Sequence, residues 1–424
     1  MKICLVALNY CPEPTGIAPY TTTLARELQQ SGHAVRVVTS YPHYPQWKVY
    51  EGYRGLASQE FDEGVSVKRL RTIVPRKPRL ITRMLMELLF GCRVSLASEL
   101  RDSDVVVVVS PALASLLACA IRGRLFARST PMIAWVQDFY GLGLREVGLS
   151  RSSRLQKAVA AVESRTLRRM TAVVAIHDSF KTHLTSELDV DDARVTVIKN
   201  WTHVRGPSSA LDVSRYRSAR GWRDDDLVVL HAGNMGKKQD LLNVVNAAAS
   251  AQNKQLDKLK FVFVGDGSER SHVEAAAGEL SNIEFHDPVP TSEFPTLLAS
   301  ADVLLLNEAS GLKGMAVPSK LTSYFFAGRP IVAATSADTP AAEEIARSSA
   351  GIRVDPANPD ELVRIINELA ASSDLRSALG DAGKDYFRSE LSQDSAITRF
   401  RTVIHSVAGS GSYRSESIVL GSPS

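Results

Sequence analysis

The stretch Ala301–Ala334 reads ADVLLLNEASGLKGMAVPSKLTSYFFAGRPIVAA, and it decides the fold class of the chain. Short apolar runs at Val303–Leu306 and Ile331–Ala334 predict two buried strands, separated by a Gly-containing loop and a helix that begins near Pro318. This order is typical of a parallel βαβ unit. In such a unit, ligands bind in the crevice beyond the carboxyl end of the strand.

The start of the predicted helix, Pro318-Ser319-Lys320, has the features of a phosphate site. Proline suits the first helical turn because its missing N–H needs no partner there, and Ser319 can cap free amide groups. Free N–H groups and the charge of Lys320 together favour an anion. An ordinary crossover helix with a solvated lysine gives the same pattern, so this stretch alone leaves both interpretations open.

The composition is that of a globular protein with well-filled cores. The chain has 424 residues, of which 44% are hydrophobic and 23% charged, and this is enough for two or three domains. A formal net charge of +4 allows an anionic ligand or membrane surface but is too small to indicate nucleic acid. The four cysteines are scattered without a CxxC pair, which argues against a disulfide framework and a zinc site.

We expect neither a signal peptide nor a transmembrane helix. The N-terminal sequence MKICLVALNYCPEPTG has a short apolar run that ends in a turn, as a first β-strand does. A run of about 20 uncharged apolar residues, which a membrane-spanning helix needs, does not occur in the sequence. We therefore expect a cytoplasmic protein, with the inner face of the plasma membrane as a surface that it could approach.

Alternating strands and helices divide the chain into two α/β halves, with a polar junction at Thr202–Asp226. A long final helix is predicted from about Asp381 to Val407, with no strand after it. We predict a first domain at residues 1–203, a second domain at residues 204–393, a helix at residues 394–408 that crosses back onto the first domain, and a disordered Gly/Ser-rich tail at residues 409–424.

Two loops of the first half carry candidate site residues. Gly16 stands where a helix begins, so a ligand could approach the backbone closely there, although a tight turn explains this glycine equally well. The GxGxxG spacing of a dinucleotide-binding loop is missing. Asp138 follows the predicted strand Met132–Val136, and the carboxyl ends of such strands collect the polar residues of α/β sites.

The loop AGNMGKKQ, which follows a predicted strand at Leu227–His231, is the strongest phosphate candidate in the chain. Gly233 and Gly236 give a Gly-containing turn from the strand to the next helix, and Lys237 and Lys238 add two adjacent cations. Backbone amides and a cation are what a diphosphate needs. A charged surface loop is the competing interpretation.

A basic and apolar segment at residues 76–100, RKPRLITRMLMELLFGCRVSLASEL, is predicted to form a helix that contacts a membrane surface. A buried helix with a solvated basic entrance is the alternative, because the apolar residues surround most of the helix. The basic residues are Arg76, Lys77, Arg79 and Arg83, and the apolar residues include Leu85, Leu88, Leu89 and Phe90.

Several motifs, weak alone but specific in their order and spacing, resemble those of one family. They are NYCPEPTGIAPYTTTLARELQQSGHAVRVVTSYPHYPQW, VQDFY, VIKNW, HAGNMGKKQ, VGDGSER and VPSKLTSYFFAGRPIV, between Lys2 and about Val407. They are similar to the family 4 retaining glycosyltransferases of the GT-B group, in particular the colanic-acid type and other bacterial polysaccharide enzymes. The resemblance implies two Rossmann-like domains facing each other across a cleft. It places the acceptor on the first domain and a nucleotide-diphospho-sugar donor mainly on the second.

The resemblance also implies roles for individual residues. Gly16 would approach the donor phosphate and the transferred sugar, Lys237 or Lys238 would neutralise the diphosphate, and Asp138 would lie near the acceptor or the transferred sugar. Cations already in place can stabilise the departing diphosphate, so we expect no metal ion and no other cofactor. The predicted catalytic residues are Asp138, Lys237 and Lys320, and the predicted donor-binding residues are Gly16, Asn200, Gly233, Asn234, Gly236, Lys238, Gly265, Asp266, Gly267, Pro318, Ser319 and Ser323.

The chain departs from the family pattern at three positions. Two glutamates usually flank the loop before the signature helix, and the corresponding residues here are Met315 and Ser323. The arginine that usually binds phosphate in the middle loop is Asn234. Ser323 could hydrogen-bond a hydroxyl group of the donor, and Glu308 or Lys313 could contact the sugar.

We therefore predict a glycosyltransferase that moves a sugar from a nucleotide-diphospho-sugar to a lipid-linked glycan with retention, in exopolysaccharide or cell-surface polysaccharide synthesis. One alternative is a catalytically degenerate GT-B protein that acts as a scaffold in a polysaccharide assembly complex, which Met315 and Ser323 favour. Another is a nucleotide-sugar 2-epimerase, which would need no acceptor. The intact loops GNMGKKQ and VPSKL favour an active enzyme.

Overall fold

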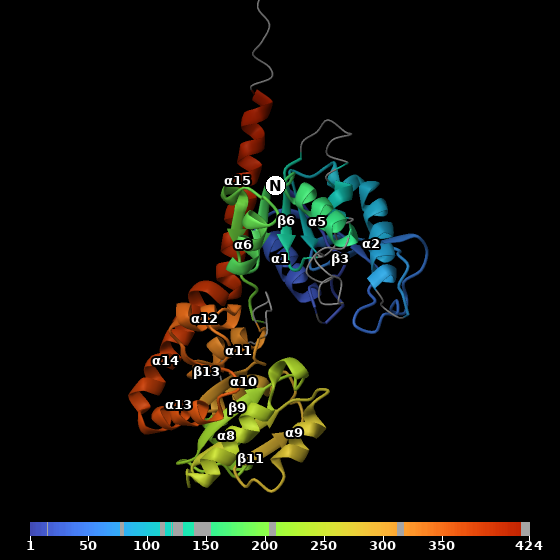
Figure 1. Cartoon of the computed structure of the whole chain (residues 1–424). Helices are drawn as coiled ribbons and strands as arrows, with labels where there is room; N and C mark the ends of the chain where they lie inside the picture. The colour runs from blue at the N-terminus through green and yellow to red at the C-terminus, as the bar shows by residue number, and fades with distance from the viewer. Residues whose placement is uncertain are drawn as a thin grey trace, which may run out of the picture. The chain divides into compact units, whose positions relative to one another are not determined.

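The chain forms two compact units in the computed structural model, which describes residues 1–14, 16–76, 80–110, 115–119, 121, 130–139, 154–202, 209–311 and 318–416. The first unit comprises Met1–Asn200 and the chain from Ala396 onward, and the second comprises Trp201–Ser395. Each unit is built around one sheet with helices packed on it (Figure 1). This confirms the predicted pair of Rossmann-like α/β domains.

The first unit contains an eight-stranded sheet with the order β3-β4-β2-β1-β5-β6-β7-β8. All neighbouring strands are parallel except β3 and β4, which form an antiparallel edge that the sequence did not predict. From β4 onward this is the strand order of a doubly wound fold, with its switch point between β1 and β5. The strands are β1 (Lys2–Val6), β2 (Ala34–Ser40), β3 (Ala57–Asp62), β4 (Val65–Leu70), β5 (Val105–Ser110), β6 (Met132–Val136), β7 (Ala172–Ala175) and β8 (Val195–Val197).

The last helix of the chain belongs to the first unit. The Phe400 ring of α15 packs on Trp135 of β6, with 4.7 Å between the ring centroids. His405 of the same helix meets His33, with 5.4 Å between centroids. These contacts confirm that the final helix returns to the N-terminal domain. The main helices of this unit are α1 (Ala18–Gln30), α2 (Leu80–Ser95), α5 (Arg154–Leu167), α6 (Asp178–Ser186) and α15 (Gln393–Glu416).

The final helix differs from the predicted one at both ends. A single helix was expected over Asp381–Val407, but a π-helical turn at Phe387–Leu391 and extended backbone at Ser392 separate α14 from α15. The break allows α14 to pack in the second unit and α15 in the first. At the other end α15 continues to Glu416, into the segment 409–424 predicted to be disordered. Extending an existing helix is far cheaper than starting one, even at about 1 kcal/mol per glycine.

The second unit contains a six-stranded parallel sheet with the order β11-β10-β9-β12-β13-β14. This is the Rossmann strand order, with its switch point between β9 and β12. Both faces are buried: Leu227 and Val229 of β9 enter one core, and Val228 and Leu230 enter the other. The strands are β9 (Leu227–Ala232), β10 (Leu259–Val264), β11 (Ile283–His286), β12 (Val303–Asn307), β13 (Ile331–Ala334) and β14 (Gly351–Val354).

Helices cover the two faces of this second sheet as separate layers. One core includes residues of α8 and α13, which pack against each other, and the other includes residues of α10 and α11. The helices of the second unit are α7 (Ala210–Ala219), α8 (Leu242–Asn253), α9 (Arg270–Ala277), α10 (Phe294–Ser300), α11 (Lys320–Ala327), α12 (Pro340–Ser348), α13 (Pro359–Ala371) and α14 (Ser373–Tyr386).

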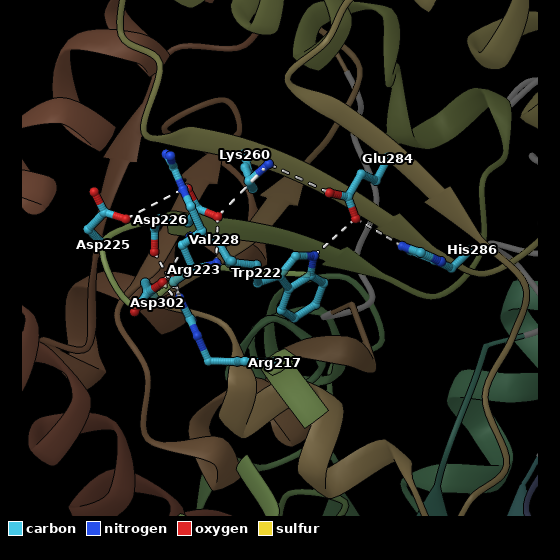
Figure 2. A network of polar contacts seen from close by, with 10 residues as sticks. All are labelled: Arg217, Trp222, Arg223, Asp225, Asp226, Val228, Lys260, Glu284, His286 and Asp302. Carbon is cyan, nitrogen blue, oxygen red and sulfur yellow. Dashed lines mark hydrogen bonds and ion pairs between the residues drawn. The ribbon is translucent and has the colours of Figure 1, made fainter. Parts of the chain in front are cut away.

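The segment Thr202–Asp226, predicted as a polar junction, contains helix α7, and Arg217 fixes this helix to the second sheet. The Arg217 guanidinium donates to the Asp302 carboxylate at 3.0 Å and to the carbonyl oxygens of Arg223 and Asp226 (Figure 2). It also donates to the carbonyl oxygen of Ser300 at 2.8 Å. The same Asp302 carboxylate accepts from the N–H of Val228 at 2.8 Å. One arginine therefore joins the junction helix to the starts of β9 and β12.

The polar network continues along the sheet through Lys260 and Glu284 (Figure 2). Lys260 Nζ lies 3.9 Å from the carboxylates of both Asp226 and Glu284. The indole N–H of Trp222 donates to Glu284 at 3.0 Å. Asp226 and Asp302 precede their strands, whereas ligands of parallel sheets bind at the carboxyl ends. We assign this network a structural role for that reason.

Helix α2 has a buried face and an exposed apolar face. Met86 and Phe90 are buried in the core of the first unit, whereas Leu85 and Leu88 are 49% and 53% exposed. Of the apolar residues named as possible membrane contacts, Phe90 is therefore a core residue, whereas Leu85 and Leu88 stay exposed. Among the described helices of the chain, none has the length and apolarity to cross a membrane.

Candidate functional site

Two glycine-containing loops of the second unit stack on each other where β9 and β10 end. The Gly233 N–H donates to the Val264 carbonyl oxygen at 2.8 Å, and the Met235 N–H donates to the Asp266 carbonyl oxygen at 2.9 Å. A Cβ atom at Gly265 would lie 2.0 Å from the carbonyl oxygen of Gly233. Packing between the loops thus requires a glycine at 265, whether or not a ligand approaches there.

The same requirement holds at Gly267, where a Cβ atom would lie 2.3 Å from the carbonyl oxygen of Met235. Asp266, between these two glycines, accepts from the Gly267 N–H through its own carboxylate at 2.8 Å. The turn at Gly265-Asp266-Gly267 therefore packs against Gly233 and Met235 and holds them in place. These residues lead directly into the turn that carries Lys237 and Lys238.

Lys237 and Lys238 lie on a 3-10 turn (Lys237–Gln239) and are exposed. The Gln239 side chain closes the turn from within, because its Oε1 accepts from the Gly236 N–H at 3.0 Å and from the Asn234 amide at 3.2 Å. Asn234, which stands at the position of the family arginine, thus has a role in shaping the loop. Lys237 and Lys238 are thus exposed on a turn whose backbone is held, and the N–H groups of Gly233 and Gly236 are engaged within the protein.

A residue that the sequence analysis missed, Asn307, holds the other side of this turn. It is the last residue of β12 and is fully buried. Its Nδ2 donates to the carbonyl oxygens of Gln239 and Asp240 at 2.8 and 3.0 Å, and its Oδ1 accepts from Asn243 at 2.8 Å. A polar residue that ends an apolar strand, as in VLLLN, was the available signal.

Lys320, the first residue of α11, brings a partly buried cation to the same loop. Its Nζ lies 3.3 Å from Nε2 of His231, the second residue missed from sequence, and about 4.0 Å from the position of a Cβ atom at Gly233. An ammonium group can only donate, so the His231 Nε2 accepts. Burial lowers the pKa of His231 well below its usual value, and the neighbouring Lys320 charge lowers it further.

Burial also lowers the pKa of Lys320, to about 8, although the Glu308 carboxylate opposes this shift. Burial raises the pKa of Glu308 itself, against the effects of its hydrogen bond from Thr335 and the charge of Lys320. The Thr335 hydroxyl donates to Glu308 Oε2 at 2.5 Å. A partly desolvated lysine that faces a polar loop is a typical functional group, because an anionic ligand would restore its full charge.

The other predicted residues around α11 are less engaged. Pro318 and Ser319 were predicted in the first turn of the helix, but α11 begins only at Lys320, and Ser319 makes no capping hydrogen bond. Ser323 Oγ lies 3.5 Å from the hydroxyl of Thr202. Met315, at the position of one family glutamate, and Lys313 lie outside the described residues.

The predicted residues of the first unit lie at the carboxyl ends of its strands. Gly16 lines a cavity of about 180 Å³ and has a φ of 69° that favours glycine. Asp138 is exposed, and its carboxylate accepts from the Phe139 N–H at 2.8 Å. Asn200, predicted to bind the donor, exchanges two amide hydrogen bonds with Gln137 at 2.7 and 3.1 Å.

Comparisons with known proteins agree with this architecture. The family "Glycosyl transferase 4-like domain" matches residues 15–201, and "Glycosyl transferases group 1" matches residues 212–386. The chain is 30% identical over 355 residues to WcaI of Escherichia coli (strain K12), a colanic acid biosynthesis glycosyl transferase by name, covering 80% of this chain and 84% of that protein. It is 24% identical over 341 residues to the glycosyltransferase WbjE of Pseudomonas aeruginosa, covering 77% and 81%.

Solved structures share the fold at lower identity. HepE of Anabaena, crystallised with UDP, superimposes with a TM-score of 0.69 at 16% identity, over 96% of this chain and all of that one. WaaG, a glycosyltransferase involved in lipopolysaccharide biosynthesis, gives a TM-score of 0.61 at 17% identity, over 95% and 98%. With two Rossmann-like units and a relative at 30% identity over most of both chains, this chain belongs to the family 4 glycosyltransferases of the GT-B fold.

Proposed function

We propose that this glycosyltransferase moves a sugar from a nucleotide-diphospho-sugar to a lipid-linked glycan during polysaccharide synthesis. The observation that carries the proposal is the Lys320 ammonium, held by His231 beside the loop of Gly233. A cation in place before the donor arrives stabilises the charge that develops on the departing diphosphate. The names of the relatives agree, since WcaI is named for colanic acid biosynthesis and HepE was solved with UDP and with UDP-glucose.

In this proposal three lysines bind the diphosphate from two sides. Lys320 is the fixed cation, and the exposed Lys237 and Lys238 close on the diphosphate from the solvent side. These three cations supply the charge that a metal ion would otherwise provide, so we propose metal-independent transfer. Retention of the anomeric configuration follows from the family resemblance, and Asp138 remains a candidate for the acceptor side.

The scaffold and 2-epimerase alternatives are less favoured, because the relatives named above are glycosyltransferases. A scaffold would also have no need for a desolvated lysine beside the glycine loop. Ser323 stands where most family members have their second glutamate. Its hydroxyl group lies 3.5 Å from the hydroxyl group of Thr202. We propose that a hydroxyl contact to the donor replaces the missing carboxylate there.

The proposal is tested by incubating the purified chain with a panel of nucleotide-sugars, with and without vesicles that carry lipid-linked glycans, in EDTA. We expect one donor to release its nucleoside diphosphate only when the acceptor is present, and the glycan to gain one sugar with the donor's anomeric configuration by NMR. Epimerised donor without acceptor would support the 2-epimerase. Donor binding without release would support the scaffold, and activity lost in EDTA would refute metal independence.

We further propose that α2 approaches the membrane that holds the acceptor. Exposed Leu85 and Leu88 lie on the same helix as the exposed Arg83, and Arg76 is also exposed, whereas Lys77 and Arg79 lie outside the described residues. Each basic residue near an anionic surface contributes about 1 kcal/mol.

Flotation with anionic liposomes tests this contact. We expect the wild-type chain to float at low salt, and a variant with all four basic residues changed to Gln to stay in solution, because the attraction is electrostatic and screened. Liposome binding that depends neither on these charges nor on salt would show that the basic residues do not attach the protein to the membrane.

A further inference from the structure

Glu87 of α2 is a buried carboxyl group that the proposed mechanism does not use. Its side chain is 4% exposed, and among the described residues no hydrogen bond or ion pair reaches its carboxyl group. Arg83, one turn earlier, is the charged group that acts on it. Burial raises the pKa of Glu87 to about 8, which the Arg83 charge partly offsets. A buried polar group without a partner is costly and therefore needs an explanation.

A second buried carboxylate in the same region shows what a structural role looks like. Glu13 is 3% exposed, and its Oε1 accepts from the backbone N–H groups of His43 and Tyr44 at 2.7 and 2.8 Å. Its Oε2 accepts from the Asn9 amide at 2.8 Å. Glu13 thus joins two loops through hydrogen bonds to both of its carboxylate oxygens. Glu87 makes no such link among the described residues.

Glu87 lines the cavity of about 180 Å³ that also includes Gly16. The cavity lies at the carboxyl ends of β1 and β5, which is the switch point of the first sheet and the expected place for a ligand. Pockets for drug-sized ligands measure about 300 to 1,000 Å³, so this one suits a single small ring.

Two aromatic rings form another wall of the cavity. The rings of Tyr44 and Trp47 meet at 84° with 6.0 Å between centroids, and the Arg83 guanidinium lies 5.6 Å from the Trp47 centroid. Trp47 has a φ of 52°, a left-handed conformation that is strained for a bulky residue and is typical of functional positions. An aromatic wall and a hydrogen-bonding carboxyl group in one cavity match a pyranose ring, which has an apolar C–H face and a polar edge.

We propose that this cavity holds one neutral pyranose ring of the acceptor, with a ring hydroxyl group hydrogen-bonded to Glu87 and the ring face against Trp47. This inference rests on the proposed transfer function for the identity of the ligand as acceptor. A mostly protonated carboxyl group near neutral pH both donates to and accepts from a hydroxyl group. It makes Glu87 a specificity-determining residue for the acceptor.

Trp47 provides a direct binding assay that needs no donor and no turnover. Trp135, Trp201 and Trp222 are buried to 3% exposure or less, whereas Trp47 is partly exposed, so acrylamide quenching of the full chain reports mainly on Trp47. We expect at least one neutral methyl hexopyranoside to protect this fluorescence, and the methyl glycoside of a uronic acid not to do so. A Trp47→Phe variant should lose the protected component.

The key variant is Glu87→Leu, with Glu87→Gln and Glu63→Gln as matched controls. Because a ligand hydrogen bond is lost, Glu87→Leu should weaken glycoside protection and raise the acceptor KM about tenfold, with the donor KM unchanged. Its Tm should stay the same or rise, since no native hydrogen bond is removed. Glu87→Gln should retain most binding, and Glu63→Gln, at a carboxylate that is 53% exposed, should behave as wild type.

The outcomes separate this inference from the proposed function. Glu87-dependent protection of Trp47 without sugar transfer from any donor would support the pocket and defeat the transfer function. Normal transfer with an unchanged acceptor KM in Glu87→Leu would defeat the pocket alone. The pocket is also overturned if no glycoside protects Trp47, or if Glu87→Leu lowers the Tm while binding is kept.

Discussion

Replacing Lys320 with methionine is expected to lower kcat/KM for the donor on the order of 10²-fold, because it removes the partly buried cation beside the glycine loop. Methionine keeps an unbranched apolar side chain of similar length, so the packing beside Gly233 should survive. Folding stability should not fall, since the variant removes a desolvated charge. The matched control is Lys258→Met, at a lysine that is 68% exposed and lies before β10, at the opposite end of the strand from the site.

The same lysine should set a pH dependence. With a pKa of about 8 in the free protein, Lys320 carries its charge below pH 8 and loses it above, so kcat/KM for the donor should fall as the pH rises through about 8. Two titratable groups face it, namely His231, which burial keeps neutral, and Glu308. Lys320→Arg should remove this fall in kcat/KM at high pH, because arginine stays charged. A wild-type profile that is level to pH 9, with Lys320→Met as active as the Lys258→Met control, would contradict the assignment.

Gly265→Ala is expected to destabilise the second unit by about 3 kcal/mol or more. Residue 265 has a φ of 147°, a region used almost only by glycine, and its new Cβ atom would lie 2.0 Å from the Gly233 carbonyl oxygen. Gly278→Ala separates the two causes, because Gly278 has a φ of 53° and a ψ of −121°, also unfavourable for alanine, but open space around it, and should cost less, about 1 to 3 kcal/mol. Urea unfolding followed by tryptophan fluorescence measures both variants.

Donor binding should follow the same order as stability. Displacing Gly233 moves the turn that carries Lys237, so Gly265→Ala should weaken nucleotide binding even under conditions where the chain stays folded. Equal free energies of unfolding for Gly265→Ala and Gly278→Ala would show that the loops can separate at no cost. The close packing of the two loops would then be unimportant for the site.

The strands that sequence predicted best are those buried on both faces. β5 with its five consecutive valines and β13 read as apolar runs because parallel strands here have helices on both sides. The β3–β4 edge was missed for the opposite reason. β3, ASQEFD, has no buried residue, and its Phe61 is 77% exposed, so its pattern carries no apolar period that predicts a strand.

The site was predictable where one residue type carries the chemistry. Lys320 and the glycine loop stood out because glycines and lysines after a strand indicate an anion site. His231 and Asn307 were missed because each lies at or next to the end of an apolar strand, and only the fold shows which groups they contact. Glu87 was hidden among the apolar residues of α2. Gly265 was predicted for a ligand's approach, but the fold assigns it a packing role as well.

The most direct test of the account is a crystal structure of the full chain with UDP, the nucleotide found with HepE, and with GDP and ADP in parallel. We predict that the diphosphate of the bound nucleotide lies on the second unit, with an oxygen about 2.7 to 3.2 Å from Lys320 Nζ and others facing the ammonium groups of Lys237 and Lys238. A diphosphate held by the first unit, or one on the second unit that leaves Lys320 in contact with His231 alone, would contradict the central claim.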